Sequence, residues 1–242
     1  MQIIGIDRPG YGLSTYNERK ELQDFNADVN SIAQHLGIER FGVLGWSGGG
    51  AFALAYLACF PERVTKAVIA GTPALPFDAS TAHNIPFARL VMKIPFLGFV
   101  AMKRMSREVL RADNDIVAFL RSRQGRRLLH ACSKSDLKYF SDPAWMMLMY
   151  QSMAEAFRQG DEGVKAVFAE HQAFMKAWPV SFSKIPTGKL VIWHGSEDKT
   201  CRVANADLIA RSIPRSQLEI FEGKGHCVLF DNFGKLGEIF GS

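Results

Sequence analysis

Short apolar runs alternate with amphipathic stretches along much of this chain. Apolar runs of strand length occur at residues 3–6, 41–45, 66–70, 189–193 and 217–221. Between the first two runs, apolar residues recur at helical spacing from Leu22 to Leu36, and Gly37 then supplies a stop signal. This alternation of strands and helices predicts an α/β fold with a mostly parallel sheet.

The alternation stops between about Pro73 and Pro186, where helix formers and repeated prolines occur without a convincing strand. The sequence therefore predicts a core at 1–72 and 188–242 with a helical insertion at 73–187. Ligands of α/β sheets bind at the carboxyl ends of the strands, and an insertion that leaves the sheet there would cover the site. We expect this insertion to act as a cap that shapes substrate choice.

The composition is that of an ordinary soluble globular protein. The chain has 242 residues, of which 48% are hydrophobic and 22% charged, enough for one buried core with an insertion. This composition excludes disordered and fibrous classes. The four cysteines show no C-x-x-C pair and no metal-ligand spacing, so we expect reduced thiols. The start lacks a signal-peptide pattern and no apolar run has membrane-spanning length, which predicts a cytoplasmic protein.

The pentapeptide G-W-S-G-G at 45–49 follows the apolar run 41–44 and precedes a helix-forming run at 51–59. A serine on a strand-to-helix turn of this kind projects outward, and flanking glycines let the neighbouring backbone approach closely. The start of the following helix directs backbone N–H groups towards an oxyanion formed at that serine. The context predicts Ser47 as a nucleophile, with a purely structural turn as the alternative.

Two further candidates follow strands that come after the insertion. The run 189–193 leads directly into H-G-S-E-D, in which Asp198 is placed like the acid of a catalytic triad. The run 217–221 is followed by E-G-K-G-H, a flexible loop that can bring His226 over the sheet. The order serine, aspartate, histidine is the one found in α/β-hydrolases. In such a triad the imidazole takes the serine proton, while the carboxylate orients and stabilises the imidazole.

Two neighbouring side chains compete for these roles. Glu197 is the alternative acid, although the spacing from the preceding glycine favours Asp198. His194 precedes the same turn, and we interpret it as a turn-stabilising residue rather than the base. The sequence thus predicts Asp198 as the acid and His226 as the base.

Together these motifs resemble those of the α/β-hydrolase-fold serine hydrolases. The resemblance rests on D-R-P-G-Y-G-L-S at 7–14, G-W-S-G-G at 45–49, H-G-x-x-D at 194–198 and G-H at 225–226. It implies Ser47 as nucleophile, Asp198 as acid and His226 as base, with the Gly48 N–H as one oxyanion donor. It also implies a helical cap between strands 6 and 7 of the fold, no metal and no organic cofactor.

In one respect the chain departs from the pattern of that family. The family sheet has the strand order 1-2-4-3-5-6-7-8, and residues 3–6 resemble its strand 4, so strands 1–3 have no counterpart here. The loop after strand 3 normally supplies the second oxyanion N–H, and losing one such donor costs about 10²–10³ in turnover. We therefore interpret the chain as N-terminally truncated. A catalytically silent binding protein on this fold is an alternative function.

The insertion carries a basic and apolar segment. From Ile85 to Lys134, eleven Lys or Arg residues occur with three Asp or Glu residues. Beside the apolar stretch 94–100, this charge would suit an anionic substrate or a membrane surface, but a solvated helix face over an apolar lining is the preferred interpretation. Nucleic-acid binding is not expected, because no recognised module accompanies the charge. The candidates for an acyl pocket are Trp46, Phe96, Phe99, Trp145, Met146 and Met149.

The sequence thus predicts a serine esterase that forms an acyl-enzyme on Ser47 and releases it with water activated by His226. The expected partner is a small-molecule ester or acyl substrate, and no oligomeric state is predicted. The same triad also suits C–C bond hydrolysis, amide hydrolysis, acyl transfer and cofactor-free perhydrolysis, because fold and triad do not fix the substrate.

Overall fold

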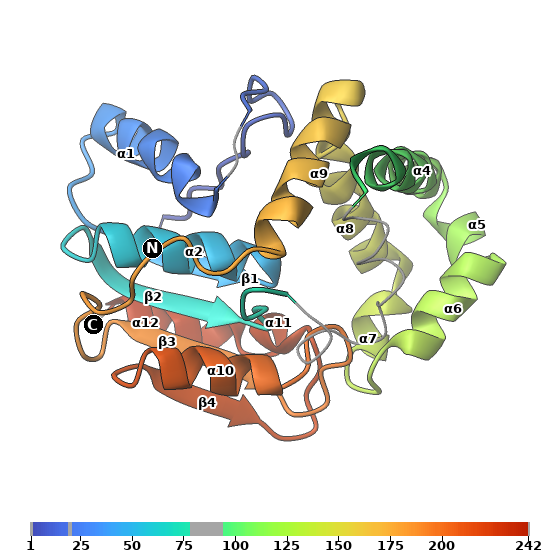
Figure 1. The fold of residues 1–242 in the computed structure, drawn as a ribbon. Helices are drawn as coiled ribbons and strands as arrows, with labels where there is room; N and C mark the ends of the chain where they lie inside the picture. Colours follow the sequence, from blue (N-terminus) through green and yellow to red (C-terminus); the bar gives the residue numbers. More distant parts are fainter. Residues whose placement is uncertain (1, 19–20, 78–93, 242) are drawn as a thin grey trace. The chain divides into compact units, whose positions relative to one another are not determined.

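The computed structural model in Figure 1 describes residues 2–18, 21–77 and 94–241. The chain separates into two compact units. The first, called the sheet unit, comprises Met1–Gly5, Glu21–His83 and Met175–Ser242. The second, called the helical unit, comprises Ile6–Lys20 and Asn84–Phe174, so it includes a loop that the sequence pattern predicted as part of the core.

The sheet unit is built on four parallel strands. They are β1 (Phe41–Trp46), β2 (Val64–Ala70), β3 (Leu190–Gly195) and β4 (Gln217–Phe221), arranged in the order β1-β2-β3-β4 (Figure 1). The register aligns Trp46 with Ala70 and Ala70 with Trp193, so the strands end at the same edge of the sheet. The four later runs of the sequence are therefore confirmed as strands of a parallel sheet.

The prediction of a strand at 3–6 is wrong. Residues 2–6 have no strand conformation, and the side chains of Ile3 and Ile4 are 65% and 44% exposed. A strand is stable only when a neighbouring strand pairs with its N–H and C=O groups. In the described part of the chain β1 is the edge of the sheet, with β2 as its strand partner, so the apolar run at 3–6 is left without a ladder.

Helices cover both faces of this sheet. They are η1 (Leu22–Phe25), α1 (Asn26–His35), α2 (Gly48–Cys59), α10 (Ala204–Ser212), α11 (Val228–Asp231), η2 (Phe233–Lys235) and α12 (Leu236–Gly241). Alternate residues of β2 point to opposite faces, as the period of two requires. Ile69 packs in one cluster with Leu54 of α2, and Val68 packs in another with Val228 of α11.

The predicted helix between Leu22 and Leu36 is present in two pieces, η1 followed by α1. Gly37 has a φ of 67°, the left-handed conformation that commonly terminates a helix. Helix α2 is apolar on all sides, and its residues from Ala53 to Ala58 are buried without a break.

The helical unit contains helices and no strand among its described residues. They are α4 (Pro95–Asn114), α5 (Ile116–Arg121), α6 (Arg123–Ala131), α7 (Leu137–Phe140), α8 (Pro143–Glu155) and α9 (Asp161–Phe174). The prolines at 95 and 143 stand in the first turn of their helices, where no intrahelical N–H bond is lost. Throughout the described ranges, no helix combines the length and the hydrophobicity needed to cross a bilayer.

The loop at 6–18 is attached to helices of the same unit. The Arg8 guanidinium forms an ion pair with the Glu170 carboxylate of α9, and the Tyr11 hydroxyl donates to the same carboxylate at 2.7 Å. The Gly12 N–H donates to the Glu155 carbonyl of α8 at 2.8 Å. Because these partners lie on two helices, the D-R-P-G-Y-G-L-S loop packs as part of the helical unit.

Candidate active site

Ser47 lies on the sharp turn between β1 and α2. Alone among the described non-glycine residues it has a positive φ, with φ 53° and ψ −129°. Its N–H donates to the Ala70 carbonyl at the end of β2, and its carbonyl accepts the Gly50 N–H. A non-glycine residue keeps such a conformation only where its surroundings enforce it, and such strain concentrates at functional sites. Gly48 is the first residue of α2, where the N–H groups of a helix have no intrahelical partner.

Two glycines permit this turn for different steric reasons. A Cβ on Gly45 would lie 2.5 Å from the Gly50 Cα and 2.6 Å from the Gly49 carbonyl oxygen. A Cβ on Gly50 would lie 1.9 Å from the Thr72 hydroxyl oxygen. A Cβ on Gly49 would meet nothing within 4 Å. Close approach of the Gly49–Gly50 backbone therefore requires glycine at 45, and close approach of the Thr72 side chain favours glycine at 50, while position 49 of the pentapeptide has room for a side chain.

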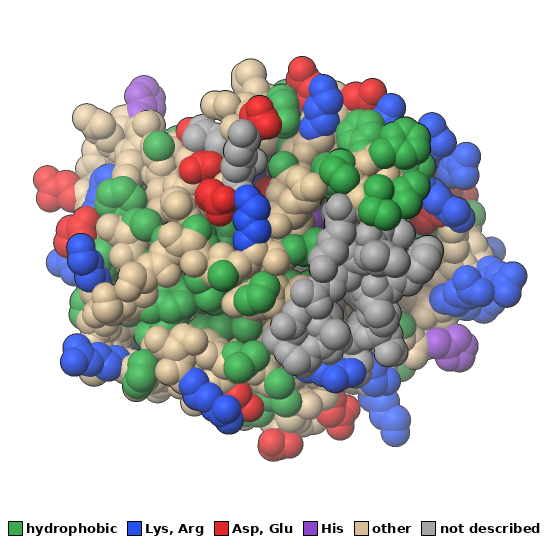
Figure 2. Space-filling model, in the orientation of Figure 1, with side chains coloured by type: hydrophobic (Ala, Val, Ile, Leu, Met, Phe, Trp, Pro, Cys, Tyr) green, Lys and Arg blue, Asp and Glu red, His purple; other side chains and the backbone are tan. Residues whose placement is uncertain are grey.

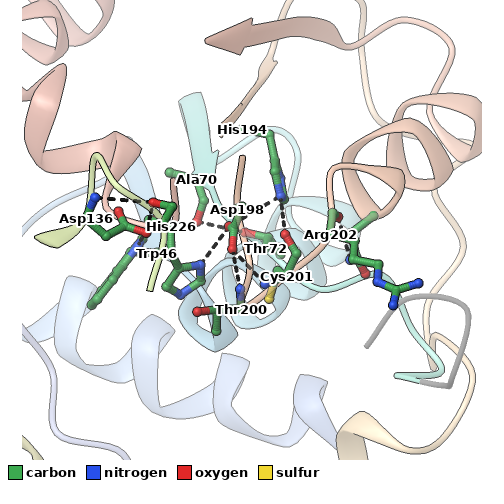
Figure 3. A network of polar contacts seen from close by, with 12 residues as sticks. Trp46, Ala70, Thr72, Asp136, His194, Asp198, Thr200, Cys201, Arg202 and His226 are labelled. Atoms are coloured by element: carbon green, nitrogen blue, oxygen red, sulfur yellow. Dashed lines mark hydrogen bonds and ion pairs between the residues drawn. The ribbon is translucent and has the colours of Figure 1, made fainter. Parts of the chain in front are cut away.

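Asp198 lies in the turn that follows β3, and both of its carboxylate oxygens accept hydrogen bonds (Figure 3). One oxygen accepts the N–H groups of Thr200 and Cys201, each at 2.8 Å. The other is 2.8 Å from Nδ1 of His226. Asp198 is only 4% exposed, so these bonds replace water around a buried carboxylate. Glu197, the competing acid, is exposed.

The loop that carries His226 is joined to the turn that carries Asp198. The Glu197 N–H donates to the Lys224 carbonyl at 2.8 Å, and the Gly223 N–H donates to the Ser196 hydroxyl at 3.0 Å. A Cβ on Gly195 would lie 2.3 Å from the Lys224 carbonyl oxygen, so glycine is needed for this approach. These contacts hold the loops after β3 and β4 at a fixed spacing, which sets the distance between the carboxylate and the imidazole.

His226 also contacts the residues around the serine turn. The Trp46 indole N–H donates to the His226 carbonyl at 2.9 Å, and the two ring centroids are 5.2 Å apart (Figure 3). Gly71 directly follows the residue that binds the Ser47 N–H, and a Cβ there would lie 3.1 Å from Nδ1 of His226. The three predicted triad residues thus belong to the sheet unit, in turns that follow β1, β3 and β4.

His194 takes a position beside the pair rather than within it. It is completely buried, its Nε2 is 2.9 Å from the Cys201 carbonyl oxygen, and it is 3.5 Å from Asp198 (Figure 3). Burial lowers the pKa of His194, which keeps the imidazole neutral. A neutral Nε2–H that donates to the Cys201 carbonyl helps to hold the turn whose N–H groups bind Asp198. This geometry fits the interpretation of His194 as a turn-stabilising residue.

Most of the candidate pocket residues lie in the helical unit. Phe96 is 74% exposed at the start of α4, whereas Phe99 is half-buried and packs against Phe168. Met146 of α8 is completely buried, Met149 is half-buried, and Trp145 packs against Tyr139 and Phe140. A role for these five residues in lining a pocket stays a prediction. Trp46 belongs to the sheet unit, and its hydrogen bond to the His226 backbone was not foreseen from the sequence.

Comparisons with known proteins agree with this architecture. Residues 1–233 match the family model described as alpha/beta hydrolase fold. Monoacylglycerol lipase ABHD6 of Bos taurus is 24% identical over 99% of this chain and 66% of its own length. A 2-hydroxymuconate semialdehyde hydrolase from a Pseudomonas species is 26% identical over 99% of this chain and 75% of its own length. The chain thus spans slightly less than two thirds of the lipase that it matches.

Solved structures show the same fold at low identity. A meta-cleavage product hydrolase (CumD) from Pseudomonas fluorescens superimposes with a TM-score of 0.65 at 21% identity, covering 97% of this chain and 78% of that chain. An esterase from Exiguobacterium antarcticum superimposes with a TM-score of 0.61 at 22% identity, again covering 97% of this chain and 78% of that chain. With its parallel sheet, its serine turn and this match over most of its length, the chain belongs to the alpha/beta hydrolase fold family.

Proposed function

We propose that this chain is a serine hydrolase that cleaves carboxylic esters through Ser47, His226 and Asp198. Ser47 Oγ attacks the ester carbonyl carbon while His226 Nε2 accepts the hydroxyl proton. The tetrahedral intermediate collapses, the C–O bond to the alcohol breaks, and His226 returns the proton to the leaving alcohol. Water then attacks the acyl-enzyme with the same imidazole as base, which releases the acid and restores Ser47.

The observation that carries this proposal is the pairing of Asp198 with Nδ1 of His226 at 2.8 Å. A carboxylate that accepts Nδ1–H fixes the tautomer that leaves Nε2 unprotonated, which is the form a general base requires. Asp198 is itself held by two backbone N–H groups, so it keeps its place as the imidazole becomes charged. The strained backbone of Ser47 is a second, independent sign of a functional turn.

The oxyanion of the intermediate would lie near the start of α2. The Gly48 N–H is the donor that this proposal assigns, because it belongs to the residue after the nucleophile. The positive end of the α2 macrodipole adds to the stabilisation of negative charge there. Each donor of this kind contributes about 2.7–4 kcal/mol to the stability of the transition state.

Cleavage of C–C bonds is the second candidate function. Two kinds of relative support it: the 2-hydroxymuconate semialdehyde hydrolase at 26% identity and a 2-hydroxy-6-oxo-6-phenylhexa-2,4-dienoate hydrolase of Comamonas testosteroni, also at 26%. The monoacylglycerol lipase at 24% identity supports ester cleavage. We favour esters because hydrolysis of an ester needs no step beyond the triad chemistry, since the alcohol leaves as soon as it is protonated.

A substrate panel separates the two candidates. Purified chain is assayed with p-nitrophenyl esters of increasing acyl length, monoacylglycerols and a 2-hydroxy-6-oxo-dienoate, with Ser47→Ala as the inactive variant. Ser212→Ala is a matched control, because Ser212 is an exposed serine of α10 in the same unit. Turnover of esters that Ser47→Ala abolishes supports the proposal. Turnover of the dienoate alone would replace it with C–C hydrolysis, and turnover that survives in Ser47→Ala would overturn the assigned nucleophile.

A further inference from the structure

Helix α4 presents a stripe that is apolar at one end and basic along the rest. Phe96, Val100, Arg104, Arg107 and Arg111 succeed one another at spacings of three or four residues, so they share one face of the helix. Phe96 is 74% exposed and Val100 is 47% exposed. The opposite face is buried and consists of Gly98, Met102, Ser106, Val109 and Ala112. The exposed stripe is therefore the outer face of a helix that is packed on its other side.

Further apolar side chains extend the exposed end of this stripe. Ile94 and Leu97 are 44% and 43% exposed, next to Phe96 in the chain. Figure 2 shows hydrophobic side chains gathered over the helix labelled α4 in Figure 1, with Lys and Arg side chains at the border of that area. A contiguous exposed apolar patch that is rimmed by polar residues is typical of a protein or membrane interaction site.

The segment that runs from α4 to α6 is strongly positive. From Pro95 to Ala131, which covers α4, α5 and α6, eight Lys or Arg residues accompany three Asp or Glu residues. Two of the acids, Asp113 and Asp115, lie at the far end of α4 from Phe96. The third, Glu108, lies 3.3 Å from Arg104. The basic groups are Lys103, Arg104, Arg107, Arg111, Arg121, Arg123, Arg126 and Arg127.

We propose that α4 docks this protein on the surface of an anionic lipid bilayer. In this arrangement Phe96, Leu97 and Val100 enter the boundary between head groups and acyl chains, and the arginines of the stripe contact lipid phosphates. Helices that expose Phe or Leu together with Lys or Arg bind in the plane of the interface, with a strength set by the buried apolar area and by attraction to anionic lipids. Each basic side chain near an anionic surface strengthens binding by about fivefold. This attraction declines with distance from the surface over about one Debye length, so salt weakens it.

A bilayer fits this surface better than other occupants do. A second copy of the chain docked on the same stripe would bring two sets of arginines together, and like charges oppose such an interface. A nucleic acid would contact the arginines but would leave Phe96 and Val100 in water. A lipid surface satisfies both ends of the stripe, since it offers phosphates and an apolar layer within a few ångströms of each other.

The test is sedimentation of the full chain with lipid vesicles. Vesicles of phosphatidylcholine are compared with vesicles that contain about one third phosphatidylglycerol, at low and high salt. The variants are Phe96→Ser/Val100→Ser and Arg104→Gln/Arg107→Gln/Arg111→Gln. The control is Leu148→Ser, because Leu148 is 64% exposed on α8, a helix without Lys or Arg. Circular dichroism verifies that each variant is folded.

The proposal predicts that the chain binds anionic vesicles more strongly than neutral vesicles. Salt should weaken this binding. The serine pair reduces binding by about tenfold or more, and the glutamine triple by about 100-fold. Leu148→Ser binds like the unmodified chain. Failure of the unmodified chain to bind anionic vesicles would overturn the proposal, as would equal binding by the serine pair. A dimer in sedimentation velocity that Phe96→Ser/Val100→Ser dissociates, without vesicle binding, would assign the surface to self-association instead.

Discussion

Three of the four glycines around Ser47 give a testable prediction, because an alanine at position 45, 49 or 50 would meet different surroundings. At position 45 the new methyl group would lie 2.5 Å from the Gly50 Cα and 2.7 Å from its nitrogen. These are backbone atoms, which cannot rotate away. At position 50 it would lie 1.9 Å from the Thr72 hydroxyl oxygen, a side-chain atom. At position 49 it would meet nothing within 4 Å.

The expected free energies of unfolding follow from these contacts. Overpacking in a rigid interior costs about 1–3 kcal/mol, and Gly45→Ala should lie at the upper end because three backbone atoms would have to shift together. Gly50→Ala should lower the free energy of unfolding by a similar amount. Adding Thr72→Ala to this variant should restore part of the loss. Gly49→Ala should be neutral or stabilise by about 0.5 kcal/mol, because alanine loses less backbone freedom than glycine in a helix.

Two assays measure the effects separately. Urea unfolding followed by circular dichroism gives the free energy of unfolding of each variant. The rate of labelling by a fluorophosphonate gives the integrity of the serine turn. A double-mutant cycle between Gly50→Ala and Thr72→Ala should show a favourable coupling of about 1 kcal/mol, since the two changes share one contact.

Equal destabilisation by Gly49→Ala and Gly45→Ala would contradict this prediction. Such a result would mean that the pentapeptide glycines act through backbone freedom rather than through close approach. An absence of coupling between positions 50 and 72 would likewise show that the Thr72 side chain does not limit the approach of α2.

Three further predictions concern the residues around the site and the loop of the helical unit. Asp198→Asn should lower kcat by about 10⁴ with little change in fold, whereas Glu197→Gln should leave kcat nearly unchanged, as measured with the best ester of the panel. The lowered pKa of His194 means that the folded chain stays neutral there while the unfolded chain takes up a proton below about pH 6.5. The free energy of unfolding should therefore fall as the pH drops below that value, by up to about 1.4 kcal/mol per pH unit, and urea titrations of His194→Gln should show a shallower slope. Glu170→Gln should destabilise by about 1–3 kcal/mol, because it removes the charged partner of two side chains, whereas Glu155→Gln at an exposed pair should change less than about 0.5 kcal/mol in the same titration.

Much of the sheet unit was predictable from local patterns. The run that became β3 is buried along its whole length and the run that became β2 along most of it, so both consist mostly of apolar residues. The edge strands β1 and β4 are only partly buried, but their apolar residues still give a signal within five or six residues. The serine turn was predictable for the same reason, since strand, glycines and helix are all adjacent in the chain. The choice of Asp198 over Glu197 depended on one spacing, and the structure places only the former within 2.8 Å of His226.

Features that depend on distant partners were not predictable. The run at 3–6 has the composition of a strand, but strand formation requires a neighbour, and pattern alone does not supply one. The hydrogen bond from the Trp46 indole to the His226 carbonyl was also not predictable, because it joins residues 180 positions apart. The attachment of Arg8 and Tyr11 to Glu170 is of the same kind, since nothing near residue 8 in the sequence indicates a partner on α9.

The central claim is that Ser47 is an activated nucleophile, and the most direct test is the intact mass of the chain after treatment with a fluorophosphonate. We expect one adduct per chain, located on Ser47 by peptide mapping. The adduct should be absent in Ser47→Ala, form much more slowly in His226→Ala and be unchanged in Ser212→Ala. A folded chain that takes up no adduct, or one that carries the adduct on another residue, would contradict it.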